Sequence, residues 1–229
     1  MTKKPINQAG RRIWQREKTV PPSQIHELKI TLHESKPPIW RQFAVPSDIL
    51  LSDLHKVIQV VMGWTNSHLH QFTIPNAQPK PTKEELTSLD WQGRLERLTM
   101  QRDRCLSDPR MEIEDAEDES KVKLCEIAAT VKSKFIYEYD FGDGWDHVIQ
   151  VVKIGPPAEG VTYPVCISGK HACPLEDCGG MWGYYEKLEV LKNPKHEDYE
   201  DIAEWVGEYF DPERFDVEEI NAQLAELRS

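Results

Sequence analysis

The 229-residue sequence contains no apolar run approaching the about 20 residues of a membrane-spanning helix, so we expect no membrane segment. The basic pair Arg11 and Arg12 is not followed by an apolar stretch, which argues against an export signal. The cysteines number five, an odd count that does not suit a disulfide framework. These absences predict a cytoplasmic protein with reduced thiols.

The sequence also lacks an overall excess of the basic residues that contact nucleic-acid phosphates. Its net charge is −11, although residues 1–24 carry six Lys and Arg against one acid. The other 205 residues therefore carry −16. We expect 1–24 to be a basic flexible tail with weak affinity for nucleic acid at most. We expect the acidic body, 25–229, to bind no nucleic acid tightly.

Alternating apolar residues predict most of a β-sheet. The patterns indicate two antiparallel hairpins, at 25–45 and 135–154, with proline- or glycine-bearing turns between their strands. A further strand is expected at 68–74.

Apolar residues at helical spacing predict a helix over 52–62, with Ser52 as its N-cap and Gly63 as its left-handed end. The C-terminal part contains three more apolar stripes of helical period, and Asp216 is expected to cap the last of these helices. Thr82 and Glu85 have capping-box spacing, which indicates a short helix there.

Together these patterns predict an α+β fold with a single domain over 25–229. Its sheet is mostly antiparallel, built from the two hairpins and the 68–74 strand. An N-terminal-half helix and a helical C-terminal region pack on it. Residues 75–120 are expected to be an irregular acidic insertion. Within it, Glu112 to Glu119 hold six acids in eight residues, a pattern typical of a solvated loop.

His68 and His70 stand two apart in the expected strand, so their side chains share one face. Two imidazoles on one face can bind a single metal ion. The alternative is a pair of histidines at the edge of the core, beside Phe72 and Ile74.

A second polar cluster follows the strong aromatic strand that starts at Phe135. It holds Asp140, Asp143, Trp145, Asp146 and His147 around a glycine-bearing turn. Carboxylates and an imidazole can bind a metal or exchange protons there. The alternative is a tight turn whose aspartates accept hydrogen bonds from their own backbone.

A third cluster contains the residue types that structural zinc prefers, namely Cys166, His171, Cys173 and Cys178. Its spacing departs from the usual zinc knuckle, and buried inert cysteines are the alternative. Glu176 and Asp177 precede Gly179 and Gly180, which can approach an anion at a helix N-terminus or make a sharp turn.

These clusters, in this order, resemble the plasmid pRiA4b ORF-3-like family over about residues 25–224. The motifs that carry the resemblance are Ile39-Trp-Arg41, Gly63-Trp64, Ser67-His-Leu-His-Gln-Phe72, Tyr137-Glu-Tyr-Asp-Phe-Gly-Asp143 and Cys173-Pro-Leu-Glu-Asp-Cys-Gly-Gly180. One departure is Leu175, where the family pattern has a second proline. The resemblance implies an α+β domain of the kind found on plasmids and mobile elements. It implies no list of catalytic residues.

Two functional hypotheses follow. The first is a non-enzymatic binding module for a protein or small ligand, since no catalytic constellation is complete. The second is a metal-dependent hydrolase-like enzyme that uses His68, His70, Asp143 and His147, with a divalent metal such as zinc as cofactor. If strand 68–74 neighbours the second hairpin, these four side chains are expected to meet at one sheet end, as a polar network or around the metal. The polar cluster as a whole comprises His68, His70, Asp140, Asp143, Trp145, His147, Glu176 and Asp177.

Overall fold

A computed structural model describes residues 24–76, 82–94, 103–207 and 210–228. Eight strands form one sheet in the order β5-β4-β3-β6-β7-β1-β2-β8. Every neighbouring pair is antiparallel except β4 and β5. The strands are β1 Ile25–Leu32, β2 Trp40–Pro46, β3 His70–Ile74, β4 Arg104–Ser107, β5 Glu117–Asp118, β6 Lys134–Tyr139, β7 Trp145–Gly155 and β8 Val165–Lys170.

The two predicted hairpins are confirmed. β1 pairs with β2, and β6 pairs with β7. The pairing of β1 with β7 joins them into one sheet, and β3 continues the sheet from β6. The predicted strand at 68–74 is two residues shorter in the structure, because it begins at His70. His68 therefore lies in the connection that leads into β3.

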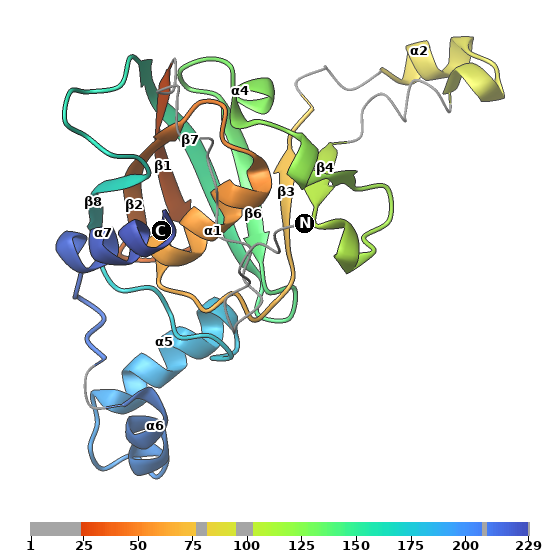
Figure 1. Ribbon diagram of the computed structural model, residues 1–229. Helices are drawn as coiled ribbons and strands as arrows, with labels where there is room; N and C mark the ends of the chain where they lie inside the picture. Colours follow the sequence, from red (N-terminus) through yellow and green to blue (C-terminus); the bar gives the residue numbers. More distant parts are fainter. Residues whose placement is uncertain (1–23, 77–81, 95–102, 208–209, 229) are drawn as a thin grey trace, which may run out of the picture.

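One helix, α1 (Leu51–Met62), lies across one face of the sheet and closes the core (Figure 1). Alternate residues of the central strands point toward α1, so the sheet is buried on that face and mostly half-buried or exposed on the other. The largest fully buried side chains come from that face, and among them are Phe43, Phe72, Phe135, Tyr137, Tyr139 and Trp145. This single core confirms the α+β class and the one-domain expectation.

The start of α1 differs from the prediction. Ser52 lies inside the helix, and the N-cap position is Leu50, whose side chain makes no capping bond. A tertiary contact takes the place of the cap, because the Leu51 N–H donates to the Val122 carbonyl at 3.0 Å. The end of α1 is as predicted, since Gly63 has φ 90° and its N–H donates to Gln59.

Further α-helices in the described part of the chain are α2 Lys83–Ser88, α4 Leu124–Ile127, α5 Gly180–Leu191, α6 Tyr199–Val206 and α7 Val217–Glu226. The Thr82–Glu85 capping box of α2 and the Asp216 N-cap of α7 are both confirmed. α7 packs beside α1 and β8, whereas α5 and α6 extend away from the sheet (Figure 1). No helix in the described part of the chain is both long and apolar enough to cross a bilayer.

The expected acidic insertion contributes two strands, β4 and β5, to one edge of the sheet. Glu119, which ends the acidic block, is 2% exposed, so the prediction of a solvated loop is wrong at this residue. A buried imidazole compensates for the desolvation of its carboxylate, as described below. The expected basic tail lies, except for Gln24, outside the described residues, as do 77–81 and 95–102 of the insertion.

Candidate functional site

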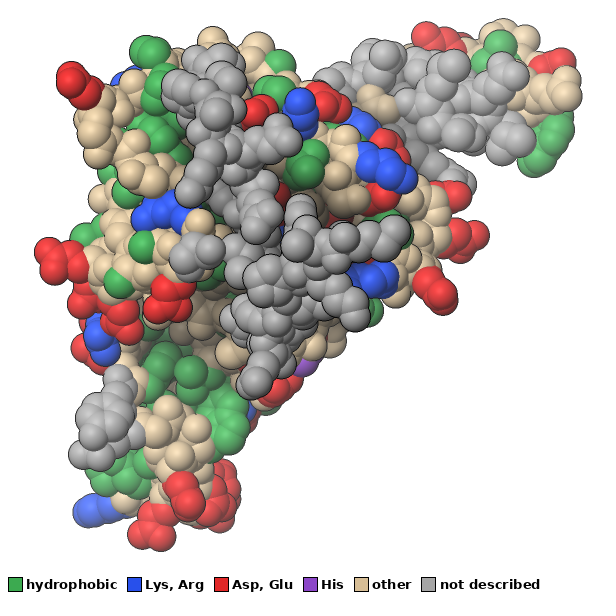
Figure 2. Space-filling model, viewed as in Figure 1, with side chains coloured by type: hydrophobic (Ala, Val, Ile, Leu, Met, Phe, Trp, Pro, Cys, Tyr) green, Lys and Arg blue, Asp and Glu red, His purple; other side chains and the backbone are tan. Residues whose placement is uncertain are grey.

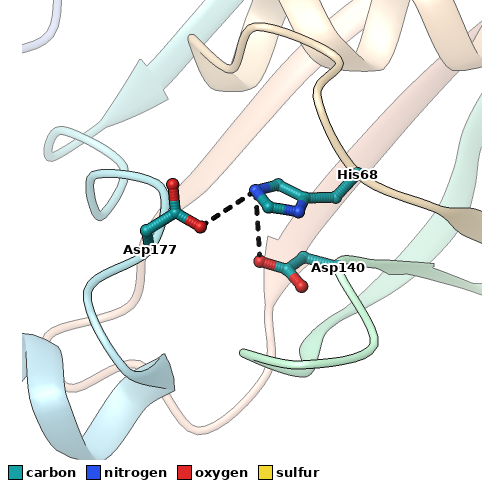
Figure 3. Close-up of side chains that lie close together, drawn as sticks. All are labelled: His68, Asp140 and Asp177. Atoms are coloured by element: carbon teal, nitrogen blue, oxygen red, sulfur yellow. Dashed lines mark ion pairs between the residues drawn. The ribbon is translucent and has the colours of Figure 1, made fainter.

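His68, Asp140 and Asp177 come together from three separate segments (Figure 3). The His68 Nε2 atom lies 3.1 Å from Asp177 Oδ1 and 3.6 Å from Asp140 Oδ2. Neither contact has hydrogen-bond geometry, so this buried nitrogen has no hydrogen-bond partner. Within the described ranges, this is the one group of three or more His, Cys, Asp or Glu side chains whose ligand atoms all lie within 4.8 Å of one another.

Asp140 is held rigidly at the end of β6. Its backbone adopts a left-handed conformation with φ 57°, and its N–H donates to the Leu69 carbonyl. One carboxylate oxygen, Oδ1, accepts from the backbone N–H groups of Gly142 and Asp143. The alternative of an aspartate bonded to its own turn therefore holds for Asp140, yet it leaves Oδ2 facing His68. The carboxylate is thus oriented toward the site before any ligand arrives.

A clamp between two loops sets the place of Asp177. The Gly179 N–H donates to Asp143 Oδ2 at 3.1 Å, which joins the loop before α5 to the β6–β7 turn. A Cβ atom on Gly180 would lie 2.5 Å from the Asp143 carbonyl oxygen, so only glycine permits this approach. Gly179 and Gly180 therefore serve as a close-contact turn, and a protein carboxylate occupies the Gly179 N–H.

Glu176 connects the same loop to the segment that carries His68. Its carboxylate accepts from the Tyr139 hydroxyl and from both the hydroxyl and the N–H of Thr65. Burial and this hydrogen bond raise the pKa of the Tyr139 phenol well above its ordinary value. Tyr139 is therefore a neutral donor to Glu176, and its oxygen also accepts from the Ser67 N–H at 2.9 Å.

His70 lies in a different environment, inside the core. Its side chain is 2% exposed, and Nε2 lies 2.9 Å from Glu119 Oε2. Its ring stacks on His55 of α1, with centroids 3.4 Å apart and planes 4° from parallel. Burial lowers the pKa of His55 to about 3, and the neighbouring His70 contributes to this lowering.

His55 and Glu119 were not among the predicted site residues. The signal for His55 was its place in the apolar stripe of the helix, four residues before Gln59, which is also buried and polar. His55 Nδ1 and Gln59 Nε2 both contact the Tyr137 hydroxyl at 2.8 Å. These contacts form an interior polar network under α1.

The predicted meeting of His68, His70, Asp143 and His147 is corrected by the structure. β6 lies between β3 and β7, so His70 faces Tyr139 while His147 faces Tyr137. His147 is fully buried, its Nδ1 lies 3.1 Å from the Tyr137 carbonyl, and burial lowers its pKa to about 4. Asp143 is engaged by Gly179. Trp145 is buried near Trp64, with ring centroids 6.0 Å apart.

The predicted zinc set is not gathered either. Cys173 Sγ contacts Arg41 and Met62, and Cys178 Sγ contacts the Gly180 carbonyl. Cys166 lies in β8, and His171 Nδ1 pairs with Glu213 at 3.0 Å. Burial raises the pKa of the Cys166 thiol to about 11 and that of Cys178 to about 12. The alternative of buried, unreactive thiols fits this geometry.

Comparisons with known proteins agree with the predicted resemblance. The family model described as "Plasmid pRiA4b ORF-3-like protein" matches residues 24–219. The chain is 34% identical over 185 residues to the uncharacterized protein y4hQ of Sinorhizobium fredii (strain NBRC 101917 / NGR234), covering 81% of this chain and 82% of that protein. It is also similar to the crystal structure of protein of unknown function MM3350 from Methanosarcina mazei Go1. That match has a TM-score of 0.71 and 37% identity, and it covers 86% of this chain and 98% of that one.

Proposed function

The chain belongs to the plasmid pRiA4b ORF-3-like family, and from the geometry of its loop cluster we propose that it is a binding module for a divalent metal ion. His68, Asp140 and Asp177 are the proposed ligands. The observation that carries the proposal is the His68 Nε2 atom, which is buried between two carboxylates without a hydrogen-bond partner. A buried polar atom in that position is stabilised by a cation that both carboxylates can share.

A proton on Nε2 is the competing occupant, because an imidazolium would also pair with the two carboxylates. Hydrogen bonds from a protonated Nε2 to the carboxylates require alignment of the N–H with the acceptor oxygen, and neither contact has it. A metal ion has a different geometric requirement, because the three ligand atoms must surround the ion. The nitrogen atom then points at the ion and need not point at a carboxylate oxygen. One imidazole and two carboxylates are ligands that zinc, manganese and iron accept.

The second candidate function is metal-dependent hydrolysis, with residues other than those first predicted. The observation that favours it is the Asp177 side chain, which is 73% exposed and opens the cluster to solvent. Three protein ligands would leave positions for water on a bound ion. Glu176, the adjacent carboxylate, is already engaged by Tyr139 and Thr65, so its evident role is positioning. The binding role therefore remains the first proposal.

The test is calorimetric titration of the chelator-treated full chain with Zn²⁺ and Mn²⁺. We expect one ion per chain, and at least about a tenfold loss of affinity in His68→Ala and Asp177→Asn. The matched control is His196→Ala. His196 Nδ1 also lies 3.6 Å from a carboxylate oxygen, that of Asp198, but just before α6 and outside the loop cluster. The proposal fails if the native chain binds neither ion, or if His68→Ala binds as tightly as His196→Ala.

Two further expectations accompany the proposal. The first is a cytoplasmic location, because all five cysteines are free, as they are in a reducing compartment. The acidic body is expected to bind no nucleic acid tightly. Filter binding of the full chain to DNA checks the second expectation, because any affinity should disappear with modest salt.

A further inference from the structure

A cavity of about 360 Å³ lies between the C-terminal end of α1, the loop 172–176 and the segment 210–223. Figure 2 shows hydrophobic side chains in the hollow between the body that carries α7 and the α5–α6 arm. The volume lies at the lower end of the about 300–1,000 Å³ of small-molecule sites. Its apolar lining includes Val60, Met62, Trp64, Phe210, Phe215 and Ile220.

A buried cation, Arg41 of β2, lines the same cavity. Arg41 is 3% exposed, and its guanidinium lies 4.9 Å from the Phe215 ring centroid. Nε donates to the Val61 carbonyl, and Nη1 donates to the carbonyls of Trp40 and Lys170. Nη2 has two N–H groups, and its acceptor is Cys173 Sγ at 3.5 Å, a weak one.

The charge of Arg41 is not balanced by the described part of the chain, where it forms no ion pair with a carboxylate. Buried charges in proteins are normally paired, because an isolated one costs several kcal/mol of desolvation. The C-terminal end of α1, which Arg41 contacts at Val61, offers about half a negative charge. Burial raises the pKa of the Cys173 thiol, so this side chain supplies no negative charge.

We infer that the cavity binds a small organic anion with an apolar body, and that its carboxylate pairs with Nη2 of Arg41. The apolar body would lie against Trp64 and Phe215, which line the cavity. Glu176, Asp211, Asp216 and Glu219 also line it, together with a second cation, Arg214, which pairs with Glu219 at 2.7 Å. The excess of carboxylates over cations would repel a ligand with several negative charges. These acids favour a monocarboxylate over a phosphate-rich ligand.

The proposed anion site is separate from the proposed metal site. Arg41 and Phe215 take no part in the cluster of His68, Asp140 and Asp177. The two sites share one segment, because Glu176 lines the cavity and is followed directly by Asp177. Binding of an organic anion can therefore be measured on chelator-treated protein, and its failure would leave the metal proposal standing.

The first experiment titrates the full chain with octanoate and with octanamide, which has the same apolar body but no charge. We expect saturable binding of one octanoate per chain, and octanamide at least about tenfold weaker, because a hydrogen bond from the guanidinium is stronger when its acceptor carries a negative charge. Equal affinity for the two compounds would show that Arg41 does not recognise the ligand. Absence of saturable octanoate binding would equally overturn the inference.

The second experiment places the ligand in the cavity. Arg41→Gln is expected to remove the preference for octanoate over octanamide, but this variant loses bonds to three carbonyls and can unfold. Ile220→Trp keeps Arg41 and fills the cavity from α7, so it should weaken octanoate at least about tenfold. Ile202→Trp makes the same change on α6, away from the lining, and should bind like the native chain. Unchanged octanoate binding by folded Ile220→Trp would reject the cavity as the site.

Discussion

His68 and His70 stand two residues apart, yet the structure places them in opposite chemical settings. His70 begins β3, and its ring is stacked on His55 and paired with Glu119 inside the core. His68 precedes the strand, and its Nε2 atom lies between carboxylates from two loops. His70 Nε2 has the Glu119 carboxylate as its partner, although its Nδ1 has no hydrogen-bond partner. His68 Nε2 faces two carboxylates and forms a hydrogen bond with neither, so a shared cation would stabilise it.

The difference shows that a histidine pair cannot be assigned to one role from its spacing. Side chains two apart share a face only while both residues belong to the strand. The strand begins at His70. The connection before it is held by hydrogen bonds to the Glu176 and Tyr139 side chains and not by pairing in the sheet. We therefore expect His70 to act only in the stability of the fold and His68 to act only as a metal ligand.

The largest effect is expected from His70→Ala. Removing the imidazole leaves the Glu119 carboxylate buried without its partner, which typically costs about 3–5 kcal/mol of unfolding free energy. His68→Ala, in the absence of metal, should cost less than about 1 kcal/mol, because the side chain is 27% exposed and its Nε2 forms no hydrogen bond that would be lost. Urea denaturation of the two variants measures both values. Equal losses would contradict the distinction between the two histidines.

The next effect concerns pH. Burial lowers the pKa of His55 to about 3 and that of His147 to about 4, below the value of 6.5 for a free histidine. The unfolded chain therefore binds more protons than the folded one, and stability is lost as the pH falls from about 6.5 toward these folded values. Each histidine adds a slope of up to about 1.4 kcal/mol per pH unit.

Unfolding free energies between pH 7 and 4 measure this dependence. His55→Gln should flatten the curve by up to one histidine's share, because glutamine can still bond to Tyr137 but does not titrate. A His55→Gln curve parallel to the native one would show that the interior network does not drive the acid sensitivity.

A smaller effect is expected from the ion. Zn²⁺ or Mn²⁺ at a hundredfold excess over Kd should raise the unfolding free energy by about 2.7 kcal/mol, since it binds only the folded chain. His70→Ala should keep this increment although it lowers the starting stability, and His68→Ala should lose it. Thermal denaturation with and without the ion gives the comparison. Loss of the increment in His70→Ala would place that histidine in the metal site after all.

The sequence supports the central sheet and the main helix because their signals are local. Alternation in β6 and β7 and the stripe of α1 depend on neighbouring residues. β8 lacks such an alternation of apolar residues, and it contains Gly169, which does not favour a strand. It forms because it pairs with β2. The start of α1 was misplaced because Val122, far along the chain, satisfies its first N–H group.

The site shows the same limit more strongly. Asp140 and Asp177 were both among the predicted polar residues, but the predicted metal set contained Asp143 and His147 in their place. Strand alternation indicated which side chains share a sheet face. It carried no information on the hydrogen bond between Asp143 and Gly179. This bond brings Asp177 to His68, and it engages the Asp143 carboxylate as an acceptor. The residue types were therefore visible in the sequence, whereas their combination depends on contacts between distant loops.

The smallest expected change is in metal affinity, and it comes from two tyrosines of β6 that repeat the contrast between the histidines. Tyr139 donates to Glu176 and accepts from the Ser67 N–H, so its hydroxyl connects the segments that carry His68 and Asp177. Tyr137 contacts His55 and Gln59 in the interior network.

Tyr139→Phe should cost about 1 kcal/mol of stability and lower metal affinity up to about tenfold, because the segments that carry the ligands lose a hydrogen-bonded connection. Tyr137→Phe should lower stability by about 1–3 kcal/mol, since it leaves buried partners unpaired, with metal affinity unchanged. Calorimetric titration of both variants decides the matter, and equal metal affinities would show that the loop cluster does not depend on the hydroxyl of Tyr139.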